Sequence, residues 1–115
     1  MTWISCNLGA MFEVETTAPG DHVVRLNLDG ELDLLTAPKL QEAIDQATAN
    51  GYRCMEIDLA KLTFIDSTGL HLLVEAHKRM KAKRAETLVV NTPPNVAKVF
   101  EVMGLDRVFA PVAQA

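Results

Sequence analysis

The chain has little of what metal sites, membrane spans and secreted disulfide frameworks require. Its 115 residues include only two cysteines and three histidines. The histidines are scattered, and Cys6 and Cys54 lack the spacing of metal ligands, so we expect no metal and no cofactor. Charges interrupt the apolar runs every few residues, and no segment approaches the roughly 18 to 20 apolar residues that span a bilayer. Since nothing requires an oxidising compartment, we expect a soluble cytoplasmic protein.

The two ends of the chain carry little information. Residues 1–10 lack the basic start and the sustained apolar centre of a secretory signal, so we interpret them as a leader or an extra edge segment. Residues 111–115 predict a frayed tail. Residues 11–110 have the length of one ordinary domain, and we expect no attached phosphatase or protease domain. Cys54 begins an apolar stretch and is predicted to be a free core cysteine rather than a partner of Cys6.

Basic residues are scarce and concentrated in one place. Eleven basic against fifteen acidic residues give a net charge of −4, which does not favour binding to nucleic acid. We interpret the basic run as a solvated helix end whose cations suit the negative end of the helix dipole. The run consists of five residues within seven positions: Lys78, Arg79, Lys81, Lys83 and Arg84.

Hydrophobic periodicity predicts the order of the secondary structure. Apolar alternation over residues 11–17 and 22–28, around a Pro-Gly-Asp turn, indicates an antiparallel hairpin. A helical pattern follows, with Thr36 as its predicted N-cap and a stop at Asn50-Gly51. The next features are a strand at 54–59 with a buried lead-in at 62–65, and then a long helix from Ser67 or Thr68 to Arg84. A strand at 86–90 comes last, before a helical stripe of Val96, Val99, Phe100 and Met103. This order predicts one α/β domain, a mixed four- to five-stranded β-sheet with helices packed against it.

The segment Phe64–Leu70 is the most informative part of the chain. A buried apolar lead-in ends at Asp66, and two hydroxyl residues and a glycine follow where a helix begins. Phosphorylation there adds about −1.5 to −2 charges at the positive end of a helix dipole, which tolerates an anion. Such a modification changes the surface and leaves the fold intact.

Three segments together resemble a known family. They are Gly30-Glu31-Leu32-Asp33 after the second strand, the Phe64–Leu70 segment, and residues 96–105. In this order the chain resembles a STAS domain of the anti-sigma factor antagonist family over about residues 11 to 110. The resemblance implies a STAS-like fold.

The resemblance also implies a function. In that family the unphosphorylated domain binds an anti-sigma factor with GHKL-type serine kinase activity and so frees the sigma factor. The kinase phosphorylates the serine after the motif aspartate, here Ser67, and a PP2C-type phosphatase reverses the step. Thr68 is the secondary candidate. The implied partner-binding residues are Asp33, Asp66, Ser67, Thr68, Gly69 and His71, in a monomer or weak dimer that is not an enzyme.

Each of these residues also has an ordinary structural explanation. Either Asp66 or Ser67 is a suitable N-cap for the helix, and Asp66 alternatively positions the hydroxyl for the kinase. Asp33 suits a turn or cap as well as a partner contact. His71 suggests a Ser-His pair, but no Gly-x-Ser-x-Gly elbow accompanies it. The Asp-Ser-Thr-Gly stretch differs by one residue in register from aspartic protease loops, and the sequence after it is helical rather than β.

Two departures from the family pattern affect the identity of the partner. His71 stands where a small residue is common, and residues 81–84 replace a frequent glycine pair after the long helix. The sequence leaves two alternative functions open: the scaffold of a stress-sensing assembly, and the cytosolic STAS subunit of an ABC lipid transporter. The intact Asp66–Gly69 motif favours the switch over the transporter subunit.

Overall fold

The computed structural model describes residues 12–105, which form a four-stranded sheet and three helices. The strands lie in the order β1 (Phe12–Gly20), β2 (Val23–Leu32), β3 (Cys54–Ile65) and β4 (Glu86–Val90). The helices are α1 (Ala37–Ala49), α2 (Ser67–Ala82) and α3 (Pro94–Val102). The predicted leader, the predicted tail and Cys6 lie outside the described residues.

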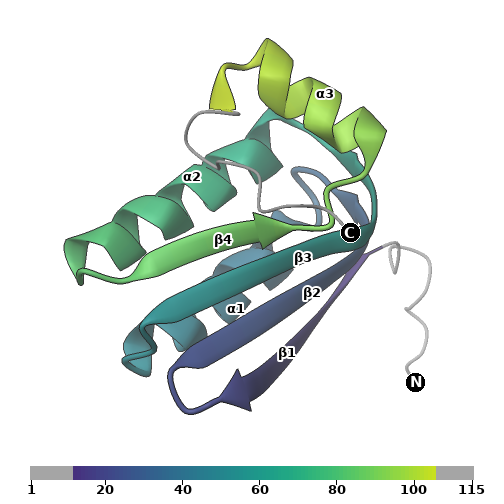
Figure 1. The fold of residues 1–115 in the computed structure, drawn as a ribbon. Helices are drawn as coiled ribbons and strands as arrows, with labels where there is room; N and C mark the ends of the chain where they lie inside the picture. The colour runs from purple at the N-terminus through teal and green to yellow at the C-terminus, as the bar shows by residue number, and fades with distance from the viewer. Residues whose placement is uncertain (1–11, 106–115) are drawn as a thin grey trace, which may run out of the picture.

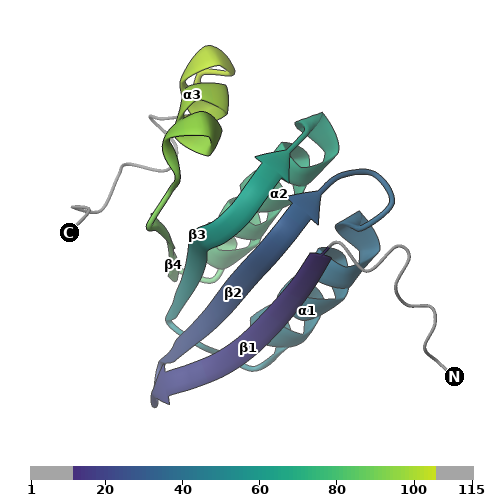
Figure 2. The same ribbon diagram turned by 90° about the vertical axis from the view of Figure 1, so that its right-hand side faces the viewer.

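The sheet is mixed, as the sequence predicted. β1 and β2 pair antiparallel, whereas β2–β3 and β3–β4 pair parallel, with Val24 opposite Met55 and Met55 opposite Thr87. Each parallel pair is joined by a helix, since α1 lies between β2 and β3 in the chain and α2 lies between β3 and β4. α1 and α2 lie side by side and pack against the sheet (Figure 1). α3 packs against β3 and lies apart from α1 (Figure 2).

The core follows the alternation of the two central strands. Inward-facing side chains of β2 and β3 pack against one side of α1 and α2, so burial of apolar surface holds the helices on the sheet. The fully buried members include Leu26, Leu28 and Leu32 of β2, Met55, Ile57, Leu59 and Leu62 of β3, Leu40 and Ile44 of α1, and Leu73 and Met80 of α2.

Two predicted core residues are in fact exposed. Phe64 was expected in the buried lead-in, but 48% of it is exposed. The β2–β3 register shifts between Gly30 and Glu31, and near the end of β3 the buried side chains are those of Leu62 and Ile65. Met103 was expected on the apolar stripe of α3, but the helix ends at Val102 and Met103 is 54% exposed.

Candidate partner-binding site

A single residue, Asp66, separates the end of β3 from the start of α2. Its Oδ1 accepts a hydrogen bond from the backbone N–H of Gly69 at 3.0 Å, and its carbonyl accepts the N–H of Leu70 at 3.0 Å. Asp66 is therefore the N-cap of α2, which decides between the two caps that the sequence allowed. Ser67 becomes the first helical residue.

Ser67 is exposed, and Thr68 beside it is half-buried. The serine lies at the N-terminus of a 16-residue helix, where backbone N–H groups carry partial positive charge. Because Asp66 supplies the side-chain cap, the Ser67 hydroxyl is not required for that role. The arrangement presents an accessible hydroxyl where an added anion is tolerated.

Gly69 fixes how closely the first turn of α2 approaches β2. A Cβ atom at Gly69 would lie 2.6 Å from Cγ and 2.8 Å from Cδ2 of Leu32, and 2.9 Å from Cγ1 of Ile65. A hydrogen bond of 3.1 Å from the Asp66 N–H to the Leu32 carbonyl joins the same two segments. Gly69 is buried, so its contribution to the site is to let the helix start lie against the end of β2.

Asp33 directly follows β2 and organises a turn that leads into α1. Its Oδ1 accepts the N–H groups of Leu35 and Thr36, each at 3.0 Å. The backbone N–H of Asp33 donates to Thr36 Oγ1 at 2.9 Å, and that hydroxyl in turn donates to the Glu31 carbonyl at 2.8 Å. The turn and capping role considered for Asp33 is therefore present.

Thr36 is the N-cap residue of α1, as the sequence predicted, but its side chain has another role. Thr36 occupies the N-cap position of α1, but its side chain makes no cap hydrogen bond to the helix. The hydroxyl is buried inside the turn, where Asp33 and Glu31 provide its partners. The start of α1 is instead favoured by Pro38, which suits the first helical turn.

A shallow apolar groove of about 340 Å³ lies between the Asp33 turn and the start of α2. Its lining residues are Leu34, Ala37, Pro38, Gln41, Thr68, His71 and Leu72. His71 is exposed at the rim. The structure thus brings the Asp33 turn, Thr68 and His71 to one surface, next to Ser67.

The sequence patterns did not identify the pair of leucines beside this groove, Leu34 and Leu35. Leu34 is 69% exposed and Leu35 is 86% exposed. The pair directly follows Asp33 and lies outside every periodic pattern. That position was the one sign in the sequence that these leucines are not part of the core. Because leucine is most often buried, an adjacent pair of leucines without such a signal is easily assigned to the core.

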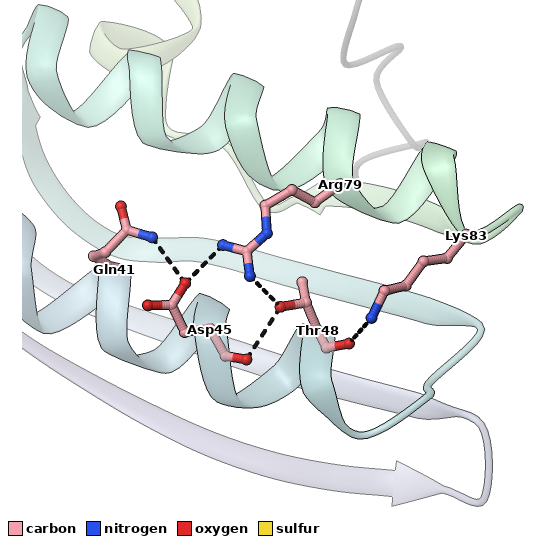
Figure 3. Close-up of polar contacts among 5 residues, drawn as sticks. All are labelled: Gln41, Asp45, Thr48, Arg79 and Lys83. Carbon is pink, nitrogen blue, oxygen red and sulfur yellow. Dashed lines mark hydrogen bonds and ion pairs between the residues drawn. The ribbon is translucent and has the colours of Figure 1, made fainter.

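The basic run lies at the end of α2, as predicted, and two of its residues bind α1. Arg79 donates to Thr48 Oγ1 at 2.7 Å, and the Lys83 ammonium donates to the Thr48 carbonyl (Figure 3). Lys83 thereby satisfies a carbonyl of the last turn of α1, which has no partner within its own helix. These cations therefore join two helices, and the predicted position of the run at a helix end is confirmed.

Cys54 is half-buried rather than fully in the core, and it is a free cysteine. Burial, together with the carboxylates of Glu56 and Glu86, raises the pKa of its thiol. The neutral, unreactive form is therefore favoured. Within residues 12–105 no cluster of His, Cys, Asp and Glu is arranged to hold a metal ion, and none of the three described helices has the length and apolar character of a membrane span.

Comparison with known proteins agrees with the fold. The STAS domain family model matches residues 13–115. The chain belongs to the STAS domain family. The anti-sigma-B factor antagonist of Staphylococcus aureus is 30% identical to this STAS protein over 92 residues, which cover 80% of this chain and 84% of the relative. The protein of the same name from Listeria monocytogenes is 31% identical over 88 residues, with 76% of each chain covered.

A solved structure supports the same assignment. The crystal structure of an anti-sigma factor antagonist from Mycobacterium paratuberculosis superposes on the STAS protein with a TM-score of 0.81 and 27% identity. The match covers 90% of this chain and 86% of that chain. The STAS protein thus shares both its sequence family and its fold with anti-sigma factor antagonists, as the sequence resemblance predicted.

Proposed function

We propose that this STAS protein is an anti-sigma factor antagonist controlled by phosphorylation of Ser67. In the unphosphorylated state it binds an anti-sigma factor with GHKL-type serine kinase activity, and this releases the sigma factor. The supporting observation is the exposed Ser67 hydroxyl at the first position of α2, with Asp66 serving as the cap. The names of the relatives from Staphylococcus aureus and Listeria monocytogenes support the same class of function.

Phosphorylation acts in this proposal through surface charge. Within the free domain an anion at the N-terminus of α2 is tolerated or favoured by a few tenths to about 1 kcal/mol. In the complex the same group is removed from water against a surface that fits a neutral hydroxyl, and burying an unpaired charge costs roughly several kcal/mol. Since each 1.4 kcal/mol is about tenfold in affinity, part of that cost is enough to dissociate the complex.

The remaining roles follow from the same surface. Thr68 and His71 line the groove beside the Asp33 turn and, with Asp33 and Ser67, make up the partner-binding region, and Gly69 allows the close approach of α2. A PP2C-type phosphatase restores the binding form. The protein itself is a cytoplasmic substrate and binding module rather than an enzyme, and it works as a monomer or weak dimer.

Kinase assays test the proposal directly. Wild type, Ser67→Ala and Thr68→Ala are incubated with ATP and each GHKL-type serine kinase encoded in the same genome, and phosphorylated peptides are identified by mass spectrometry. We expect phosphorylation of wild type and Thr68→Ala but not of Ser67→Ala. In pull-downs Ser67→Ala should retain the kinase and Ser67→Glu should lose it. Undiminished phosphorylation of Ser67→Ala would rule out Ser67, and large assemblies of the chain alone would support the scaffold alternative.

A further inference from the structure

Two adjacent leucines project from the turn between β2 and α1. Leu34 is 69% exposed and Leu35 is 86% exposed, and both precede the buried Thr36. Exposed apolar side chains that lie together, rather than singly, mark surfaces that bind another molecule. The pair therefore indicates an interaction surface.

The turn holds both leucines outward through one carboxylate oxygen. Oδ1 of Asp33 accepts the Leu35 N–H and the Thr36 N–H at 3.0 Å each, and it lies 3.2 Å from Thr36 Oγ1. Aspartate and asparagine both form this kind of turn, because each supplies a side-chain oxygen to backbone N–H groups two or three residues ahead. The Asp33 carboxylate thus determines the conformation that exposes the leucines.

The same turn lies against the end of α2 that carries Ser67. The Leu32 carbonyl accepts the Asp66 N–H at 3.1 Å, and the Leu32 side chain fills the space next to Gly69. Leu34 and Thr68 line the same groove. The groove therefore begins one residue from the proposed phosphorylation site.

We propose that Leu34 and Leu35 are the apolar anchor for the kinase and that Asp33 is a positioning residue that presents them. This inference rests on the proposed function and names the surface by which the partner is held. The occupant is an apolar segment of the kinase that inserts beside Leu34, between the Asp33 turn and α2. The size of a stable interface places this segment in the groove. Such an interface covers about 800 Å² on each protein, so a kinase bound over Ser67 also covers the adjacent groove. The centre of such an interface is its most apolar part.

Binding measurements with matched variants test the anchor. The probe is the GHKL-type kinase of the same genome that wild type binds most tightly. Leu34→Ser and Leu35→Ser should each weaken binding by about tenfold or more, without lowering the melting temperature, because both side chains are exposed in the free protein. Val102→Ser is the control, since Val102 is 72% exposed on α3, away from α1 in both views (Figures 1 and 2). It should bind within about twofold of wild type.

Two outcomes would overturn the proposal that Leu34 and Leu35 anchor the kinase. One is unchanged binding by both leucine variants, and the other is an equal loss of binding with Val102→Ser.

Substitution of Asp33 separates positioning from direct contact. Asp33→Asn keeps the oxygen that accepts the turn hydrogen bonds and removes the charge, whereas Asp33→Ala removes both. If Asp33 positions the leucines, Asp33→Asn binds like wild type and Asp33→Ala binds as weakly as Leu34→Ser. Equal losses in Asp33→Asn and Asp33→Ala would show a charge contact and overturn the positioning role.

The same measurements separate this inference from the proposed function. If Ser67→Glu still loses the kinase while the leucine variants keep it, only this inference fails. If wild type binds no kinase, both proposals fail.

Discussion

The Arg79 guanidinium on α2 donates a hydrogen bond from Nη1 to Oδ1 of Asp45 on α1, at 2.6 Å and across 34 residues of sequence. The amide of Gln41 donates to the same oxygen at 3.0 Å (Figure 3). These hydrogen bonds lower the pKa of the Asp45 carboxyl, and that from Arg79 has the larger effect. The ionised carboxylate therefore links the two helices that cover the sheet.

Acid should weaken this link. Because the folded-state pKa of Asp45 is below the unfolded value, its stabilising contribution is fully present above the unfolded pKa and disappears as pH falls through the folded pKa. Melting temperatures from neutral to acidic pH should fall less steeply for Asp45→Asn than for wild type. Asp21→Asn, in the exposed β1–β2 turn, is the control and should follow the wild-type curve. Parallel curves for all three proteins would contradict the prediction.

Gly69→Ala should destabilise the domain. Alanine favours a helix over glycine by about 1 kcal/mol, but overpacking costs about 1 to 3 kcal/mol, and here the new Cβ lies 2.6 Å from Leu32 Cγ. Because all three contacts of the new Cβ are shorter than 3.0 Å, the overpacking cost should lie in the upper part of that range, about 2 to 3 kcal/mol, and we expect urea unfolding to show a net loss of roughly 1 to 2 kcal/mol. Gly20→Ala, where a Cβ has nothing within 4 Å, should change stability by less than about 0.5 kcal/mol. Equal stability of Gly69→Ala and wild type would show that the helix start can move.

Arg84→Gly should stabilise the domain. Arg84 has a φ of +60°, and its N–H donates to the Lys81 carbonyl at 2.9 Å just after α2 ends. A residue with a side chain is strained by about 1 kcal/mol or more in this left-handed conformation, whereas glycine is not. After the larger backbone entropy of glycine in the unfolded chain is subtracted, we expect a gain of about 0.5 kcal/mol in the free energy of unfolding. Arg84→Ala keeps the strain and serves as the control, with stability close to that of wild type. A loss of stability in Arg84→Gly would contradict the strain.

Ser67→Glu should fold as well as wild type. The new carboxylate lies at the exposed N-terminus of α2, where the helix dipole favours an anion by a few tenths to about 1 kcal/mol. Its melting temperature should equal or slightly exceed that of Ser67→Ala. Ser67→Lys is the informative comparison, because a cation at the same position should lower the melting temperature. A large drop for Ser67→Glu would argue against control through surface charge and for control through unfolding.

The sequence predicts the fold well where one local signal dominates. The alternation around Leu26 and Ile57 and the helix stop at Asn50 depend on neighbouring residues, and the structure confirms both. Phe64 was misassigned because its direction depends on a register shift against β2, which strand alternation does not encode. Thr36 is the N-cap residue as predicted, but its side chain makes no cap hydrogen bond because Asp33 and Glu31 bind its hydroxyl.

The site was predictable as a motif but not as a surface. Phe64–Leu70 identifies Ser67 at a helix start, and this part of the prediction depends only on adjacent residues. The groove depends on the approach of Leu34 to Thr68, 34 positions later, and on the contact between Gly69 and Leu32. Such contacts arise from tertiary packing, and no local pattern specifies them.

The hydrogen bond from the Asp66 N–H to the Leu32 carbonyl joins the two parts of the proposed binding surface. Its two partners come from the ends of β2 and β3, which pair in parallel through a crossover that includes α1. Parallel pairing is non-local and is therefore slow compared with the formation of a single helix. A newly synthesised chain contains Ser67 before the Asp33 turn has been brought beside it. Under the proposed function, a kinase that recognises both features together selects completed domains, and partly folded chains do not compete for it.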